Sequence, residues 1–312
     1  MGITEIMDSI YKITLPSVYN AAVNCYLIEH ENSYVLIDTG ENNDETKRFW
    51  EEFLPTLEKP ISHILLTHIH TDHAGCCHFL LQKAGPKIIA SSKSKEKLKT
   101  MKTDPTNVGL IETAMRYGYT YPYSPKTLIN EQEAYDFEID ETVEDGDILQ
   151  IGSLKFQAIA TPGHAVDQFC FYEQNRQVLF ASDHLIQDFS PLLIVENIQF
   201  NPLENYLRSL KKVKYIPCKL AVSGHGDVIE DTVDLIKSIE TRHVERLHQF
   251  KELLIQKPHT FEQIIQFLYK KDITKSSPQI MQTLSYLNYL LEEGSLQIIN
   301  NKDGIALQIN HI

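Results

Sequence analysis

One short stretch of the sequence does most to decide the fold: THIHTDHAG at residues 67–75. It follows an apolar segment typical of a buried strand, His63–Leu66, and a helix is expected over Ala74–Lys83. Burying many polar side chains without partners would cost several kcal/mol each, whereas coordination of a metal ion removes that cost. We therefore expect a metal site rather than a polar turn, with four potential ligands close together in the chain: His68, His70, Asp72 and His73.

Three apolar strands further along the chain also end in residues that can bind metal. A lone histidine or aspartate is more often structural, but the carboxyl ends of several strands can converge on one site. We therefore expect these ends to meet the first motif. They are Phe156–Thr161 leading to His164, Val178–Ser182 leading to Asp183, and Leu220–Ser223 leading to His225.

Strand and helix signals alternate through the first 230 residues. Val23–Glu29 and Ser33–Asp38 are predicted to form a hairpin, and a helix is expected over Asn42–Phe53. This alternation favours a mixed α/β (α+β) fold with helices on the outer faces of the sheets. The other predicted strands are Lys87–Ala90, Asp147–Ile151, Leu154–Ala160, Gln168–Tyr172, Val178–Ala181 and Leu220–Ser223.

Residues 91–140 interrupt this rhythm and are interpreted as an insertion. A helix there carries a run of lysines, which either form a solvated helix face or contact RNA phosphates. Alternating tyrosines follow, which either wall a pocket or belong to a half-buried strand edge. The lysines are Lys93, Lys95, Lys97, Lys99 and Lys102, and the tyrosines are Tyr117, Tyr119, Tyr121 and Tyr123.

The character of the chain changes again near residue 230. Helices are predicted over Asp231–Gln256, Phe261–Lys270 and Pro278–Glu293, followed by a hairpin of Ser295–Ile299 and Ile305–Ile309. This order is typical of a winged helix. We therefore predict a catalytic domain at residues 1–230 and a winged-helix-like domain at residues 231–312. The third helix carries no Lys or Arg, so DNA binding is disfavoured, and a lid, a substrate wall or a homodimer contact is favoured.

Composition limits the class of protein. The chain has 312 residues and is 42% hydrophobic, which is enough for a packed core, and its formal net charge of −13 disfavours a dedicated nucleic-acid binder. No signal peptide or membrane span is expected at the start or along the chain. The five cysteines include no CxxC pair, which favours free thiols and a cytoplasmic location.

The motif set resembles the metallo-β-lactamase superfamily, with TPGH, SD and SGHG following the first motif in that order. The resemblance covers roughly residues 6–227 and implies a four-layered αββα sandwich with the site at one edge of its sheets. It also implies that His68, His70 and His164 hold one metal ion. The resemblance further implies that Asp72, His73 and His225 hold a second ion and that Asp183 bridges the two. The C-terminal segment and the Asp183-His184 pair resemble the β-lactamase-like protein 2 branch.

This resemblance implies a binuclear hydrolase in which two divalent cations share a bridging water and lower its pKa. Zinc is the default for mixed His and Asp ligands, and iron and manganese are also compatible with them. Asp72 is expected to act in catalysis, by orienting the nucleophile or accepting its proton. His184 either protonates a leaving group, contacts substrate or serves only in packing.

The substrate is expected to contain an ester-type bond: a thioester, a lactone or a phosphodiester, RNA included. β-Lactams rank last because no export signal is seen. A mononuclear iron sulfur dioxygenase and a DNA-binding sensor of a metal or metabolite are alternatives from other classes. Metal content per chain distinguishes the dioxygenase, and a mobility-shift assay distinguishes the sensor.

Overall fold

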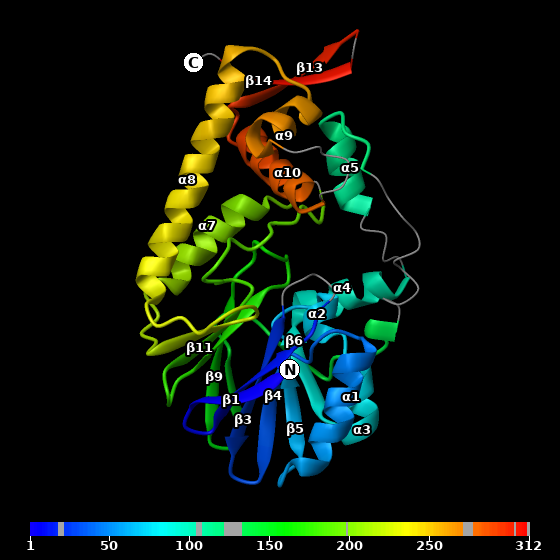
Figure 1. The fold of residues 1–312 in the computed structure, drawn as a ribbon, viewed down its shortest axis with the longest axis vertical. Coiled ribbons are helices and arrows are strands. Elements are labelled where there is room, and N and C mark those ends of the chain that lie inside the picture. The colour runs from blue at the N-terminus through cyan, green and yellow to red at the C-terminus, as the bar shows by residue number, and fades with distance from the viewer. Residues whose placement is uncertain are drawn as a thin grey trace.

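Two β-sheets face each other in the lower half of Figure 1. The computed structural model describes residues 1–17, 22–103, 108–121, 133–197, 199–270, 277–302 and 304–310. The first sheet has seven strands, in the spatial order β1 (Gly2–Met7), β2 (Ile10–Leu15), β3 (Val23–His30), β4 (Ser33–Ile37), β5 (Ile61–Leu65), β6 (Lys87–Ser91) and β7 (Glu141–Val143). The second has five, in the order β12 (Leu220–Ser223), β11 (Val178–Ser182), β10 (Phe169–Glu173), β9 (Leu154–Ala160) and β8 (Ile148–Ile151).

Parallel pairing in both sheets places the carboxyl ends of neighbouring strands at the same edge of the sheet. β4, β5, β6 and β7 pair in parallel in the first sheet, as do β11 and β12 in the second. The carboxyl ends of parallel neighbours lie at the same edge of a sheet. The segments that follow β5, β11 and β12 therefore begin at sheet edges that can face each other, as the sequence predicted.

Alternating side chains on the strands build three cores, one between the sheets and one on the outer face of each sheet. Tyr26 and Ile28 of β3 pack between the sheets, whereas Cys25 and Leu27 belong to the core on the outer face of the first sheet. In β11, Phe180 packs between the sheets and Leu179 packs outward. Successive side chains of a strand point to opposite faces, so apolar residues at consecutive positions indicate a strand that is buried on both faces.

Helices cover the outer faces of both sheets and complete the predicted αββα sandwich. α1 (Asp44–Phe53) and α3 (Cys77–Ala84) lie on the first sheet, and α7 (Pro202–Val213) and α8 (Thr232–Gln256) lie on the second (Figure 1). The Asn43 side chain caps α1 by accepting from the backbone N–H of Thr46 at 2.8 Å. Trp50 of α1 is fully buried, and its indole N–H donates to the carbonyl of Thr39 at 2.9 Å.

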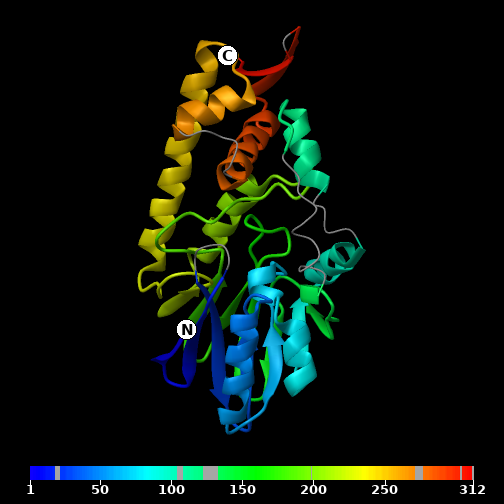
Figure 2. The ribbon, with the colours of Figure 1, turned by 45° about the vertical axis from the view of Figure 1, so that its right-hand side comes forward.

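The remaining elements gather beyond the sheets, in the upper half of Figure 2. They comprise α5 (Val108–Arg116), α9 (Phe261–Tyr269), α10 (Ser277–Glu292) and the hairpin of β13 (Leu296–Asn301) and β14 (Gly304–Ile309). The capping box of α9 is present, because Thr260 and Gln263 each bond the other's backbone N–H. The predicted helices and hairpin are confirmed as elements. The winged-helix assignment and the domain boundary at residue 230 stay predictions.

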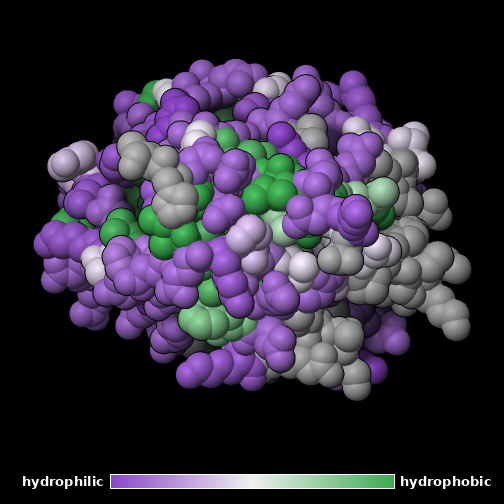
Figure 3. Space-filling model, turned by 90° about the horizontal axis from the view of Figure 1, so that it is seen from above, coloured by the Kyte–Doolittle hydropathy of each residue, from purple (hydrophilic) through white to green (hydrophobic). Residues whose placement is uncertain are grey.

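α10 is mostly buried along its described length. Ile280, Leu284, Leu287 and Leu290 join the core that α7 and α8 form with the second sheet. The end of the molecule that carries the hairpin is largely hydrophilic, with hydrophobic groups visible between the polar ones (Figure 3). A mostly buried helix without a basic residue offers no basic face to a DNA groove, in line with the low rank given to DNA binding.

Three tyrosines of residues 91–140, Tyr117, Tyr119 and Tyr121, do not lie in a strand. Tyr117 is fully buried just after α5, and its hydroxyl donates to Asn288 Oδ1 at 3.3 Å. Tyr119 packs against Phe261 with ring centroids 4.7 Å apart. The strand-edge interpretation is therefore wrong for Tyr117, Tyr119 and Tyr121, because these side chains pack instead against the C-terminal helices. Tyr123 lies outside the described residues.

Several elements were not predicted from the sequence. The strands β1 and β2, the short strand β7 and the helix α7 were all missed. The helix expected over Ala74–Lys83 is present as α3, which begins only at Cys77, and a short helix, α2 (Thr71–Ala74), precedes it. The break lies where Gly75 passes so close to the backbone of Thr71 and Asn42 that a Cβ would meet them at 2.2 and 2.6 Å.

All five cysteines are free thiols, and four of them are buried. Cys25, Cys76 and Cys77 pack on the outer face of the first sheet, and Cys170 packs on that of the second. Buried free cysteines of this kind pack as small hydrophobic residues. Among the described helices, none has both the length and the apolar character needed to cross a bilayer.

Candidate metal centre

The structure brings all seven predicted ligands together at the edge of the two sheets. Two of the three groups with ligand atoms within 4.8 Å of one another have the composition expected from the sequence. These are His68, His70 and His164, called the first group here, and Asp72, His73 and His225, called the second group. Asp183 forms a third such cluster with His68 and His73.

Imidazole nitrogens converge in the first group. His68 Nε2 lies 3.0 Å from His70 Nδ1, and His164 Nε2 lies 2.9 Å from the same atom. His68 follows the end of β5, and the chain then turns through His70 into α2. His164 arrives from the other sheet, after β9. Three ring nitrogens directed at one point are a donor set typical of zinc and related cations.

The second group combines two imidazoles with a carboxylate. His225 Nε2 lies 3.5 Å from Asp72 Oδ2, and His73 Nε2 lies 3.8 Å from the same oxygen. Asp72 and His73 stand on α2, whereas His225 follows β12. Both groups therefore take ligands from both sheets, and the sandwich must be folded before either group exists.

Asp183 lies between the two groups. Its Oδ1 is 3.3 Å from His73 Nε2, and its Oδ2 is 3.4 Å from His164 Nε2 and 3.5 Å from His225 Nε2. His73 Nε2 and Asp183 Oδ1 are buried, yet neither has a hydrogen-bond partner of acceptable geometry among the described residues. Buried polar atoms without partners are costly, so these two atoms fit the role of metal ligands.

Hydrogen bonds behind the rings fix how four of the histidines are presented. His164 Nδ1 donates to the Leu192 carbonyl at 2.7 Å, and His225 Nδ1 donates to the Ala22 carbonyl at 2.8 Å. His73 Nδ1 donates to Asp38 Oδ2 at 2.8 Å. His68 Nδ1 is likewise assigned as the donor to Thr67 Oγ1 at 3.1 Å, because the Thr67 hydroxyl itself donates to Asp38. Each Nε2 is thereby left as a lone-pair donor toward the centre, as a metal ligand requires.

Asp38 organises this backing and was missed by the sequence analysis. It also accepts from the backbone N–H and the hydroxyl of Thr67, and from the hydroxyl of Ser182. Asp38 and Ser182 both have left-handed backbone conformations, with φ of 57° and 46°. Such strain often concentrates at functional sites. The signal was available, because the apolar run Ser33–Asp38 also ends in a carboxylate.

Gly224 lets the centre close. A Cβ at this position would lie 2.2 Å from Asp183 Oδ1 and 2.7 Å from His73 Cε1. No side chain fits there without displacing the carboxylate or the imidazole. The glycine before His225 in the SGHG motif is therefore explained by close approach to the centre.

The carboxylates divide the histidines electrostatically. Burial lowers the pKa of His68 and of His70 well below 6.5, and neighbouring imidazoles lower both further. Burial also acts to lower the pKa of His225, but Asp183 and Asp72 outweigh it and raise this pKa to about 10. Burial opposes ionisation of Asp72, but His73 and His225 outweigh it and lower its pKa to about 2. The carboxylates therefore attract positive charge, which bound cations would supply.

His184 follows Asp183 but does not face the centre in the same way. It is fully buried, and its ring packs against that of Tyr206 with centroids 5.3 Å apart. Burial lowers its pKa to about 3, so the imidazole is neutral at neutral pH. These observations favour a packing role over proton donation.

The lysine run forms α4 (Ser92–Thr103), and three of its lysines are engaged by the fold. Lys95 donates to the Ile139 carbonyl, Lys102 pairs with Glu138, and Lys97 pairs with two carboxylates. Lys93 and Lys99 are exposed. The solvated-face interpretation holds for these two, and the RNA interpretation finds no support in the arrangement.

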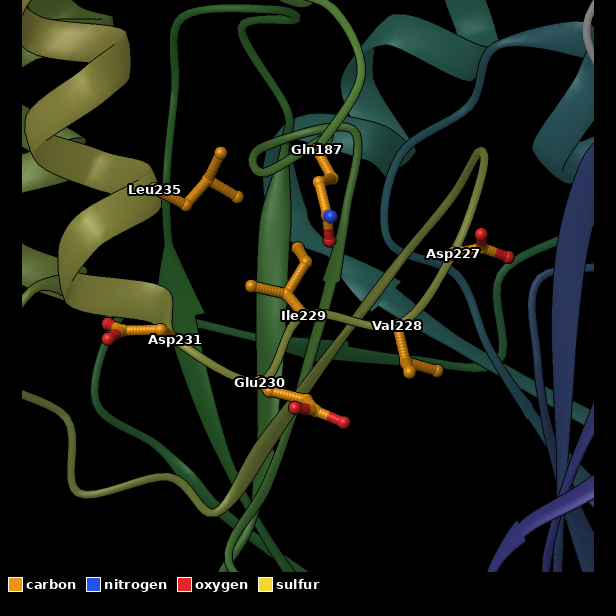
Figure 4. Close-up of a pocket in the computed structure, with 7 residues that line it drawn as sticks. All are labelled: Gln187, Asp227, Val228, Ile229, Glu230, Asp231 and Leu235. Carbon is orange, nitrogen blue, oxygen red and sulfur yellow. The ribbon is translucent and has the colours of Figure 1, made fainter.

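A cavity of about 440 Å³ lies beside the loop that carries His225 (Figure 4). Gln187, the segment of residues 227–231 and Leu235 of α8 line it. Three of the lining residues are acidic: Asp227, Glu230 and Asp231. The cavity contains none of the seven predicted ligands, so it is distinct from the two groups.

Comparison with known protein families shows to which family the chain belongs. The sequence model of the metallo-beta-lactamase superfamily matches residues 18–225, which is most of the chain and includes every predicted ligand. This chain belongs to the metallo-β-lactamase superfamily. The resemblance predicted from the HxHxDH motif is thereby confirmed, as is the sandwich fold.

Individual relatives of this superfamily member are distant. It is 28% identical over 224 residues to "Thioesterase pkgB" of Emericella nidulans, which covers 72% of this chain and 51% of that protein. The chain thus spans about half the length of the first curated relatives it matches. It is 25% identical over 314 residues to the "Beta-lactamase-like protein 2 homolog" of Drosophila melanogaster, which covers 97% of this chain and 94% of that protein.

A solved structure supports the fold over the whole length of this superfamily member. A metallo-beta-lactamase family protein from Thermus thermophilus superposes with a TM-score of 0.84 at 23% identity. The match covers 98% of this chain and 100% of that one. The elements beyond the sandwich are therefore part of an architecture that a second protein shares.

Proposed function

We propose that this metallo-β-lactamase superfamily protein is a metal-dependent hydrolase that holds two divalent cations, zinc first, and cleaves an ester-type bond. The observation that carries the proposal is the position of Asp183, whose two oxygens lie 3.3–3.5 Å from imidazoles of both ligand groups. A carboxylate in that position suits a centre with two cations better than a mononuclear one. The complete second group argues in the same direction, against a mononuclear iron dioxygenase.

Thioesters are the first substrate class that we propose. Two relatives carry thioesterase names, and the matches to them cover 72% and 67% of this chain. Lactones and phosphodiesters stay in the tested set because the donor atoms of the centre suit all three. Bound divalent cations lower the pKa of a coordinated water toward neutrality and polarise the oxygen of the bond under attack.

The residues of the chain have separate tasks in this proposal. The six imidazole and carboxylate side chains of the two groups would hold the two cations, and Asp183 would link the two groups. Asp72 is the group that accepts a proton from, or orients, the attacking water, since its side chain is 13% exposed at the centre. His184 is assigned a packing role in this proposal, because it is fully buried against Tyr206.

The test is elemental analysis of the purified chain, followed by hydrolysis of thioester, lactone and phosphodiester substrates with the metal found. We expect two equivalents of metal, and thioester cleavage that chelation abolishes and metal restores. Asp72→Asn should lose turnover even when metal is added to saturation, whereas Asp227→Asn, at a side chain that is 90% exposed, should behave as wild type. Trace metal alone, or cleavage of none of the three classes, would refute the proposal.

A further inference from the structure

Lys97 of α4 is held in an ion cluster that is largely withdrawn from solvent. Its Nζ lies 2.9 Å from Asp167 Oδ1 and 2.9 Å from Glu196 Oε2. The exposed fractions of the three side chains are 15%, 0% and 13%. An exposed pair would contribute little, but removing one partner of a buried cluster leaves charges without compensation. Loss of Lys97 is therefore expected to disturb the backbone segments to which Asp167 and Glu196 are hydrogen-bonded.

Asp167 holds the loop of the first motif. Its Oδ2 accepts from the backbone N–H of Ile69 at 3.0 Å, and Ile69 lies between His68 and His70 in the chain. The same oxygen accepts from the Ser94 hydroxyl of α4 at 2.9 Å. Movement of Asp167 would therefore move the backbone that presents two ligands of the first group.

Glu196 holds the loop of the third ligand. Its Oε1 accepts from the backbone N–H of Val166 at 2.9 Å, two residues after His164. The segment that carries Glu196 also supplies the Leu192 carbonyl, to which His164 Nδ1 donates. Both the position and the ring orientation of His164 thus depend on residues 191–197.

A second helix braces the same segment. Gly109 of α5 lies so close to it that a Cβ would meet the Glu196 carbonyl oxygen at 2.0 Å and the Asn197 Cα at 2.6 Å. Only a glycine permits this approach of the two backbones. Residues 191–197 are therefore contacted by both helices, by the Lys97 side chain of α4 and by the backbone of α5 at Gly109.

We propose that Lys97 is a positioning residue for the first group: through Asp167 and Glu196 it fixes the two loops that present His68, His70 and His164. Without the lysine cation, two carboxylates would stand close together and repel each other. The loops would then lose their shared anchor, while the second group keeps its own partners. This inference rests on the metal centre proposed above and gives α4 a role in metal affinity.

The test uses the full chain stripped of metal and titrated with Co²⁺, followed by visible absorbance and by calorimetry. Lys97→Met should weaken one of the two binding events by about 10–100-fold, the range seen when partners of metal ligands are lost. The other event should stay at the wild-type value. Lys97→Arg, which keeps the charge, should restore most of the affinity, and Lys99→Met is the matched control on the exposed face of α4.

A second variant covers the case in which Lys97→Met does not fold. Glu196→Gln keeps the size of the side chain and an oxygen for Val166, but removes one charge of the cluster. It should show the same selective loss. Wild-type affinity for both equivalents in either folded variant would overturn the inference and leave the metal centre intact. Equal weakening of both events would also overturn it. Failure of the wild-type chain to bind Co²⁺ would refute the centre itself, and the inference with it.

Discussion

The two ligand groups differ in what stands behind them. The second group is backed from within the sandwich, because His73 donates to Asp38 after β4 and His225 donates to the Ala22 carbonyl before β3. The first group is backed largely from outside it, by the Leu192 carbonyl and by carboxylates that Lys97 of α4 holds. The difference indicates that the second group depends mainly on residues next to the strands, whereas the first group also depends on α4 and on the segment that α4 holds.

Replacement of Asp183 should weaken metal binding at both groups alike, and its effect on activity should be the largest of the changes considered. Asp183→Asn keeps the shape of the side chain but removes the charge that both groups share. We expect metal content to fall at both groups, and kcat/KM to fall by more than ~100-fold, beyond what loss of an outer partner costs. Elemental analysis and kinetics on the best substrate measure this. Full metal content at wild-type activity would contradict the central place given to Asp183.

Replacement of Gly224 should disturb the second group and Asp183 together. The Cβ of Gly224→Ala would meet Asp183 Oδ1 at 2.2 Å. Overpacking of this kind costs about 1–3 kcal/mol of stability, measurable by chemical denaturation, and metal affinity should fall with it. Gly2→Ala is the matched control, since nothing lies within 4 Å of a Cβ there. A Gly224→Ala protein as stable as the control would show that the backbone yields at no cost.

Replacement of Asp38 should affect the second group more than the first. Asp38→Asn tolerates the left-handed backbone at φ 57° but weakens the acceptor for His73 Nδ1. We expect one metal-binding event to weaken by about 10–100-fold. The other should weaken less, because Asp38 reaches His68 of the first group only through Thr67. Calorimetric titration with Zn²⁺ resolves the two steps, with exposed Asp8→Asn as the control. Paired with Lys97→Met, the two variants should have their larger effects on opposite events, and larger effects on the same event would remove the contrast between the groups.

Replacement of His184 should affect neither group and have the smallest effect. His184→Phe keeps a ring against Tyr206 and removes the nitrogens. Because burial lowers the pKa of His184 to about 3, its imidazole is neutral at neutral pH and is not present as an imidazolium acid. We expect kcat/KM to change by less than about 10-fold with an unaltered pH profile, whereas loss of a general acid costs about 10²–10⁴-fold. A loss in that larger range would restore the catalytic assignment.

The sequence predicted the centre better than its supports. The seven ligand positions stand out because each polar residue follows an apolar strand, and this local pattern survives folding. Asp38 has the same form and could have been included. Lys97 could not, because it resembles its neighbours in the lysine run, and its partner Glu196 lies 99 residues away. Pairings across such distances depend on the packing of α4 and α5, which local periodicity does not describe.

The elements of the fold divide in the same way, into those that local sequence patterns predict and those that depend on distant packing. Strands buried on both faces, such as β3 and β11, were predicted from continuous apolar runs. β1 was missed because it is largely exposed, and α7 was missed although Asn201 caps it and Pro202 begins it. The tyrosines after α5 were misread because their burial depends on α9 and α10, far along the chain.

The shared carboxylate of Asp183 has a thermodynamic consequence. Because one side chain contacts imidazoles of both groups, in the proposed centre occupancy of one group would change the free energy of binding at the other. Linkage requires this coupling to be reciprocal, so each ion would alter the dissociation constant of its neighbour by the same factor. An affinity measured for either group is therefore a property of the pair, and it has meaning only when the occupancy of the other group is stated.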